Sequence, residues 1–200
     1  MKVLDIILNF CIFGITAFVG FTYFRKDHHW DVQRGKAAFK YFTCLSNNLC
    51  ATVSLLTACV RIAGFFPDWV FLLKYIGTAG VAVTMMTVLL LLAPSLGRGG
   101  LKRLLAGTEL FMHLINPLLA VGTFLLLERR GMSPAEALWG LLPVTLYGPW
   151  YLYKTVYAPE GKRWEDFYGF NRGRKWPLFF AGMLIGTAGI CALLWLGQNL

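Results

Sequence analysis

The chain contains a stretch of 25 residues, WVFLLKYIGTAGVAVTMMTVLLLLA from Trp69 to Ala93, that carries a single charged side chain, Lys74. A helix needs about 20 predominantly apolar residues to cross the hydrocarbon core of a bilayer, and this stretch exceeds that length. The apolar run is continuous and lacks the alternation of a barrel strand, so its backbone must form its own hydrogen bonds as a helix. The stretch therefore predicts a transmembrane helix.

Five other stretches have the same character. We expect them at Val3 to Phe24, Lys40 to Val60, Leu104 to Leu127, Ala135 to Tyr157 and Trp176 to Gly197. The apolar run of the first is longer than that of a typical signal peptide and has no small-residue cleavage site, which favours a helix. Hydrophobic residues make up 57 % of the chain, and no long linker divides it. The sequence predicts one all-α membrane domain over residues 1–200, a polytopic bundle of six transmembrane helices.

Basic residues predict how the bundle is oriented. The net charge is +9, and fourteen of the 19 Lys and Arg fall in the first, third and fifth loops if Lys40 and Lys154 are counted there. Because positively charged loops stay on the cytoplasmic side, we expect these loops to be cytoplasmic and both termini outside. Short basic loops between apolar stretches do not indicate a nucleic-acid partner. If the protein is bacterial, the expected location is the cell membrane.

The fifth loop mixes basic residues with aromatic ones from Trp164 to Trp176. Such mixtures are typical of segments at the headgroup level of a membrane. We therefore expect the loop to be an interfacial anchor, with a site for acidic headgroups as the alternative.

Small polar residues follow one face of the second stretch. They are spaced by three or four residues, and they are Thr43, Ser46, Asn47, Cys50, Ser54 and Thr57. This spacing places them on one stripe of a helix, which should face the interior of the bundle because polar groups in lipid are costly. Hydrogen bonds between helices explain most of these positions. The two adjacent amides, Asn47 and Asn48, need more partners than such packing usually supplies.

The fourth stretch places Glu109, His113 and Asn116 on one helix face, directly before Pro117. Proline has no N–H, so in an α-helix it frees the carbonyl of His113 and loosens the helix locally. Glu109 lies one turn from His113 and can orient its ring or share its proton. Lys74 and Asp5 lie near helix ends, and we expect both to reach water along their helices.

No metal site and no cofactor are expected. The adjacent His28 and His29 lie in a charged loop, and no Cys or His pair has the spacing of a zinc site. No glycine-rich phosphate-binding loop stands between a strand and a helix.

Two segments, Tyr41-Phe42-Thr43-Cys44-Leu45-Ser46-Asn47 and Phe111-Met112-His113-Leu114-Ile115-Asn116-Pro117, resemble the androgen-induced protein family of integral-membrane threonine hydrolases and its bacterial relatives. In that family a threonine and a histidine on two helices are the proposed catalytic pair, and the substrates are fatty acid esters of hydroxy fatty acids. The resemblance implies that Thr43 and His113 are the pair here and that the partner is a lipid or fatty-acyl ester.

This chemistry needs a base, because a threonine hydroxyl is a poor nucleophile until its proton is removed. Thr43 would attack the ester carbonyl, and His113 would take the proton and return it to the leaving group. Ser46 or Asn47 is expected to donate to the developing oxyanion, and Glu109 and Asn116 to give polar support. At about 1.5 Å per residue, Thr43 and His113 lie roughly 9 Å and 14 Å from the same loop side.

Three alternatives remain open from the sequence. An acyltransferase would use the same acyl-enzyme with an alcohol as acceptor, and Cys44 is an alternative nucleophile. A small proton-coupled transporter or channel would use Glu109 and His113 as a relay. In a purely structural membrane protein the same residues would only join neighbouring helices.

Overall fold

The computed structural model describes residues 1–200, apart from the side chain of Arg172. The chain is almost entirely helical. Its elements in order are α1 (Lys2–Tyr23), β1 (Arg25–Lys26), β2 (His29–Trp30), α2 (Val32–Ala38), α3 (Phe42–Ile62), α4 (Asp68–Thr87), η1 (Val88–Leu92), α5 (Ala93–Ser95), α6 (Gly100–Leu104), η2 (Phe111–Ile115), α7 (Asn116–Leu126), α8 (Pro134–Ala137), η3 (Leu138–Leu141), α9 (Leu142–Leu152), η4 (Tyr153–Tyr157), η5 (Arg172–Arg174) and α10 (Trp176–Asn199).

The all-α prediction is confirmed, and four helical segments of the described chain are long and apolar enough to cross a membrane: Lys2–Tyr23, Phe42–Ile62, Asp68–Ser95 and Trp176–Asn199. The other two predicted stretches are less regular. Phe111–Leu126 is apolar but shorter. From Pro134 to Tyr157 the chain is helical throughout, although it passes through a 3₁₀ turn and a π turn.

The predicted start of the fourth stretch at Leu104 is wrong. Residues Gly100–Leu104 form the separate helix α6, and the chain then turns before the next helix begins near Glu109. Gly107 takes a left-handed conformation with φ 59°, which a helix interior does not allow. The apolar pattern runs through this turn, so hydropathy alone does not reveal it.

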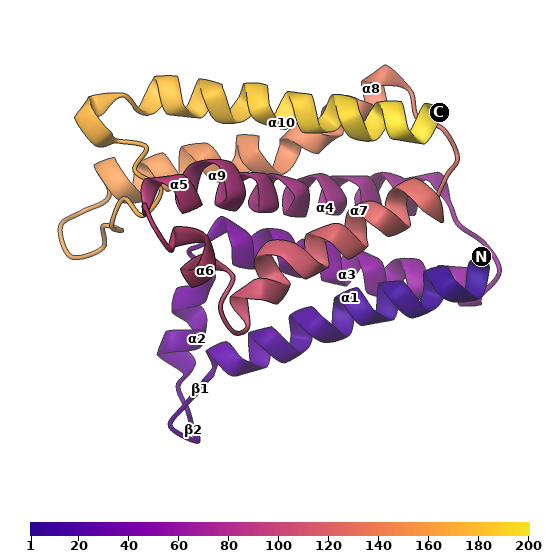
Figure 1. Cartoon of the computed structure of the whole chain (residues 1–200), viewed down its shortest axis with the longest axis horizontal. Helices are drawn as coiled ribbons and strands as arrows, with labels where there is room; N and C mark the ends of the chain where they lie inside the picture. Colours follow the sequence, from indigo (N-terminus) through magenta and orange to yellow (C-terminus); the bar gives the residue numbers. More distant parts are fainter.

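The N- and C-termini lie at one end of the bundle, whereas the β1–β2 hairpin, α2, α6 and the orange loop before α10 lie at the other (Figure 1). The first, third and fifth loops therefore share an end, and we call it the odd-loop end. Helix α4 is central, because it packs against α3, α7, η3, α9 and α10, while α1 packs against α3 and α7.

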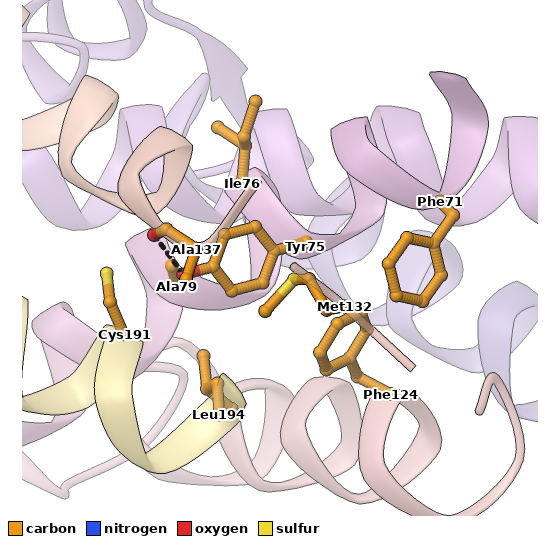
Figure 2. Close-up of a cluster of buried hydrophobic side chains, with 9 residues drawn as sticks. All are labelled: Phe71, Tyr75, Ile76, Ala79, Phe124, Met132, Ala137, Cys191 and Leu194. Carbon is orange, nitrogen blue, oxygen red and sulfur yellow. Dashed lines mark hydrogen bonds between the residues drawn. The ribbon is translucent and has the colours of Figure 1, made fainter. Parts of the chain in front are cut away.

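The largest apolar cluster lies between α4, α7, α10 and the segment before η3 (Figure 2). Phe71 and Tyr75 of α4 face Phe124 of α7, and their ring centroids lie 5.2 and 5.6 Å from the Phe124 centroid. The Tyr75 hydroxyl donates to the Ala137 carbonyl at 2.6 Å, so the one polar atom of this ring is satisfied. This cluster fixes how α10 sits on α4.

Helix α1 is polar inside and apolar outside. Asp5, Asn9 and Thr16 are buried. Phe10 and Phe18 point outward and are exposed. The same inversion holds for α3, where the predicted polar stripe is buried from Ser46 to Thr57 while leucines face outward, which confirms its predicted orientation. Apolar residues on the outer face and polar ones inside are typical of helices surrounded by lipid.

Lys74 does not reach water, which corrects the expectation from its position near a helix end. The side chain is 0 % exposed, and its ammonium donates to Asn9 Oδ1 at 2.6 Å and to Ser54 Oγ at 2.8 Å. Glu128 Oε1 lies 3.6 Å from the ammonium and accepts from Asn9 Nδ2 at 2.8 Å. A buried charge is tolerated when it is paired and hydrogen-bonded in this way.

Asp5 is buried as well, beside this ion pair. Its carboxylate accepts from Asn9 Nδ2 at 2.8 Å and lies 2.9 Å from Arg61 Nε. The cluster of Asp5, Asn9, Ser54, Arg61, Lys74 and Glu128 therefore ties α1, α3, α4 and the end of α7 together at the terminal end. We call it the terminal-end charge cluster.

Candidate functional site

A cavity of about 510 Å³ opens at the odd-loop end and contains both residues of the expected catalytic pair. Thr43 lines it from the first turn of α3, and His113 lines it from η2. Cys44, Glu109 and Tyr23 also line it. The structure thus brings the two resembling sequence segments to one cavity, which we call the vestibule.

His113 is 8 % exposed, and both ring nitrogens have partners. Nδ1 lies 2.7 Å from the Leu104 carbonyl oxygen, which can only accept, so Nδ1 carries a proton. Nε2 lies 3.4 Å from Glu109 Oε2. Tyr23 in turn donates to Glu109 Oε1 at 3.2 Å. Nε2 is therefore the nitrogen left for chemistry in the vestibule, and Glu109 is placed to stabilise the imidazolium when Nε2 is protonated.

His113 lies in a π-helical turn, and this changes which carbonyl lacks a hydrogen-bond partner because of Pro117. The Asn116 N–H bonds to the Phe111 carbonyl five residues earlier. In that register the missing N–H of Pro117 would have bonded to Met112 rather than to His113, contrary to the prediction. Asn47 Nδ2 donates to the Met112 carbonyl at 3.0 Å and supplies the missing hydrogen bond. Asn47 thereby holds α3 against the turn that positions His113.

Of the four expected oxyanion or polar-support residues, Glu109 lines the vestibule, whereas Ser46, Asn47 and Asn116 do not. Ser46 Oγ lies 2.8 Å from Thr84 Oγ1, and Asn47 Nδ2 also donates to the Thr43 carbonyl at 2.9 Å. Asn116 Nδ2 donates to Thr16 Oγ1 at 2.7 Å and to Asn47 Oδ1 at 3.3 Å. Both donors of Asn47 are taken up by the Thr43 and Met112 carbonyls, and the Ser46 hydroxyl is bonded to the Thr43 carbonyl and Thr84, so neither side chain is free to donate to an oxyanion in this arrangement. Polar support of the site by these residues stays a prediction.

Thr43 lies where the vestibule meets a narrow apolar crevice of about 30 Å³. Val88 of η1, Val144 of α9 and Phe180 of α10 line the crevice. Thr43 and His113 share the vestibule but are not hydrogen-bonded to each other in the described chain, where the ring nitrogens face Leu104 and Glu109. A substrate carbonyl would therefore have to be seated between them.

Tyr168 is a site residue that the sequence did not reveal. It belongs to the fifth loop, which we expected to be an interfacial anchor, yet it lines both the vestibule and the crevice beside Thr43. Its hydroxyl accepts from the Phe42 N–H at 3.0 Å, at the start of α3. Burial raises the pKa of Tyr168 to about 12, so the phenol keeps its proton at neutral pH. Tyr168 is thus placed to donate a hydrogen bond near Thr43.

The fifth loop is held over the site by Asp166. Its Oδ1 accepts from the Tyr151 hydroxyl at 2.8 Å and from the Phe170 N–H at 3.0 Å, and its Oδ2 accepts from the Asn171 N–H at 2.8 Å. Phe167 follows directly and packs on Tyr41, with ring centroids 4.6 Å apart. The only sequence signal for this arrangement is the aromatic density of the loop.

Among the residues that the structure describes, no group of three His, Cys, Asp or Glu side chains is arranged to hold a metal ion. Neither protein-family models, nor curated proteins, nor solved structures match this chain.

Proposed function

We propose that this chain is an integral membrane protein that hydrolyses lipid esters, with Thr43 as nucleophile and His113 as base. The observation that carries the proposal is the vestibule, in which the Thr43 hydroxyl of α3 lines one cavity with the His113 imidazole and the Glu109 carboxylate, which lie one turn apart on a second helical segment. The resemblance to the androgen-induced protein family supports the same pair and implies fatty acid esters of hydroxy fatty acids as substrates.

The shape of the site supports an amphipathic substrate. On one side of Thr43 lies the polar vestibule, and on the other lies the crevice lined by apolar side chains of η1, α9 and α10. The crevice of about 30 Å³ is too small for an acyl chain, so the side chains of η1, α9 and α10 would have to part to admit one. A chain entering there, with a polar group in the vestibule, would place an ester bond near the threonine hydroxyl. A small water-soluble ester would leave the crevice unused.

In the proposed mechanism the Thr43 hydroxyl attacks the ester carbonyl, and its proton passes to Nε2 of His113. The Glu109 carboxylate must first move off Nε2, and its side chain is 38 % exposed at the open side of the vestibule. Glu109 then stabilises the imidazolium, and Tyr168 donates to the oxyanion. His113 returns the proton to the leaving alkoxide, and water cleaves the acyl-threonine to free acid.

The transporter alternative is weakened by an apolar layer in the bundle. Ile12, Val81 and Ala120 are buried in contact with one another and with Cys50, the member of the polar stripe whose thiol is only a weak hydrogen-bonding group. Along their helices they lie between the polar layer of Asn47 and Asn116 and the terminal-end charge cluster. A proton relay through the bundle needs an unbroken series of polar groups or waters, and this layer interrupts one.

We also propose that six helices span the membrane, the irregular segments Glu109–Leu126 and Pro134–Tyr157 included, with the odd-loop end in the cytoplasm. The excess of Lys and Arg at that end supports this orientation. Arg98→Cys lies between α5 and α6, and Arg129→Cys lies between α7 and α8. In a background whose five native cysteines are replaced by serine, a membrane-impermeant maleimide should label the Arg129→Cys variant in intact cells and the Arg98→Cys variant only in permeabilised cells. Labelling of both variants in intact cells would rule out the six-span topology.

The function is tested with p-nitrophenyl esters of increasing chain length, offered to the protein in lipid nanodiscs. We expect long-chain esters to be cleaved faster than the acetate, because only their chains can extend from the vestibule past Thr43 into the apolar crevice. The His113→Ala variant should lose about 100-fold or more of this activity, the usual contribution of a general base. The control is His29→Ala, since His29 is exposed in the β1–β2 hairpin. No hydrolysis by folded wild-type protein, or equal losses in both variants, would refute the proposal.

A further inference from the structure

Three basic residues from separate elements line the vestibule: Arg34 of α2, Lys40 before α3 and Arg103 of α6. Among its lining residues Glu109 is the one carboxylate, and it already faces His113 and Tyr23. None of the three basic side chains forms an ion pair with a described carboxylate, since the acids that do so pair with Arg61, Lys74, His113 and Arg130. The vestibule therefore carries an excess of positive charge.

The three cations are positioned by neutral groups, which leave their charges uncompensated. Arg34 donates to the Arg25 carbonyl, and Arg103 Nη2 donates to the Leu96 carbonyl at 3.1 Å. The Lys40 ammonium lies 5.0 Å from the centroid of the Tyr41 ring. Carbonyl oxygens and aromatic faces orient a cation but do not neutralise it. Like charges around one cavity repel unless an anion lies between them.

We propose that Arg34, Lys40 and Arg103 form an anion site that holds the acid group of an amphipathic lipid, with its acyl chain directed past Thr43 toward the crevice. The anion is a carboxylate or a phosphate monoester, and both chemistries suit guanidinium and ammonium donors. The inference rests on the proposed function only in that the bound lipid is also the ester to be cleaved. The site then selects esters that carry a free acid over neutral ones.

The connection between the two cavities supports this placement. Thr43, Leu92 and Tyr168 border both the vestibule and the crevice, so a ligand that extends from the vestibule toward the crevice passes the nucleophile. The cations lie on the vestibule side only. A ligand with an acid at one end and a chain at the other therefore has one favourable orientation, which would fix the ester bond relative to Thr43.

The test is direct binding to protein in phosphatidylcholine nanodiscs, which does not depend on turnover. The probes are radiolabelled oleate, oleoyl lysophosphatidate and the neutral lipid monoolein. We expect wild-type protein to bind at least one of the two anionic lipids about tenfold or more tightly than monoolein. The Lys40→Gln/Arg103→Gln variant should lose this preference. The matched control, Lys36→Gln/Lys102→Gln, removes two neighbouring exposed charges that do not line the vestibule and should keep it.

Which anionic lipid binds more tightly identifies the acid as carboxylate or phosphate. Equal affinity for all three lipids would overturn the proposal, as would an equal loss of preference in the control variant. Displacement of oleate by millimolar inorganic phosphate would also overturn it, because the ligand would then be a soluble anion. Anionic binding without any ester hydrolysis would reject the proposed enzymatic function and leave the anion site standing. Ester hydrolysis without a preference for anionic lipids would reject the anion site and leave the proposed enzymatic function standing.

Discussion

Thr43→Ala is expected to lower kcat/KM for a long-chain ester by roughly 1,000-fold or more, because the variant has no nucleophile to form the acyl-enzyme. Thr43→Ser keeps a hydroxyl at the same place and should stay within about tenfold of wild type. The fold should tolerate both changes, since Thr43 is only half-buried in the first turn of α3 and Asn47 bonds to its backbone carbonyl rather than to its side chain. The measurement is initial rates in nanodiscs at several substrate concentrations.

The control for this prediction is Thr52→Ala on the same helix. Thr52 is exposed, and its hydroxyl donates to the Asn48 carbonyl, outside the vestibule. It should hydrolyse the ester at the wild-type rate. If Thr43→Ala kept full activity while His113→Ala lost it, the nucleophile would be another group of the vestibule, and Cys44→Ala would identify it.

Lys74→Met is expected to lower the free energy of unfolding by about 3–5 kcal/mol, the usual effect of removing one partner from a buried ion pair. Methionine has nearly the same length, so the loss comes from the charge and its hydrogen bonds. Asn9 and Ser54 would lose a donor, and Glu128 would remain as a buried carboxylate without its cation. Reversible unfolding of the protein in mixed micelles, followed by circular dichroism, measures the change.

Two companion variants separate the charge effect from general damage. Lys74→Met/Glu128→Gln removes both charges and should be more stable than Lys74→Met alone, because no unpaired charge is left. Lys2→Met removes an exposed charge at the same end and should change stability by less than about 0.5 kcal/mol. Wild-type stability in Lys74→Met would mean that the ammonium does not contribute to holding α1, α3 and α4 together.

The long apolar helices could be predicted because hydropathy and length are local properties. The ends of α1, α3 and α10 fall within two residues of their expected positions. The start of the fourth helix could not be predicted in this way, because the turn at Gly107 lies inside an apolar run. Hydropathy alone therefore does not locate a turn that interrupts an apolar run, such as the one at Gly107.

The behaviour of Lys74 shows a second limit of local reasoning. The position of a residue along a helix indicates how far its side chain is from water, but not which groups of other helices surround that side chain. Asn9, Ser54 and Glu128 come from three other helical segments, and only the packing of α1, α3 and the end of α7 around α4 places them at the ammonium. Each of these polar residues is visible in the sequence, whereas their convergence is a tertiary property.

The residues of the candidate site also differ in whether the sequence could predict them. Thr43 and His113 could be proposed from two short segments, and entry from the same loop side predicted similar depths. Tyr168 and Arg103 could not be proposed from the sequence. Tyr168 lies in a loop whose place over the vestibule depends on the Asp166 hydrogen bonds, and Arg103 lies in a short helix whose place depends on the turn after α5. Residues of regular helices are easier to place from sequence than residues of the loops that cover them.

The most direct test is whether Thr43 is an activated nucleophile. Purified protein in detergent would be treated with a lipophilic fluorophosphonate, and the modified residue mapped by mass spectrometry in wild type, Thr43→Ala, His113→Ala and Thr52→Ala, after circular dichroism has shown that all four are folded. An adduct on Thr43 in wild type and Thr52→Ala that is lost in the other two variants is the predicted result. Folded wild-type protein without an adduct on Thr43 would contradict the proposed hydrolase.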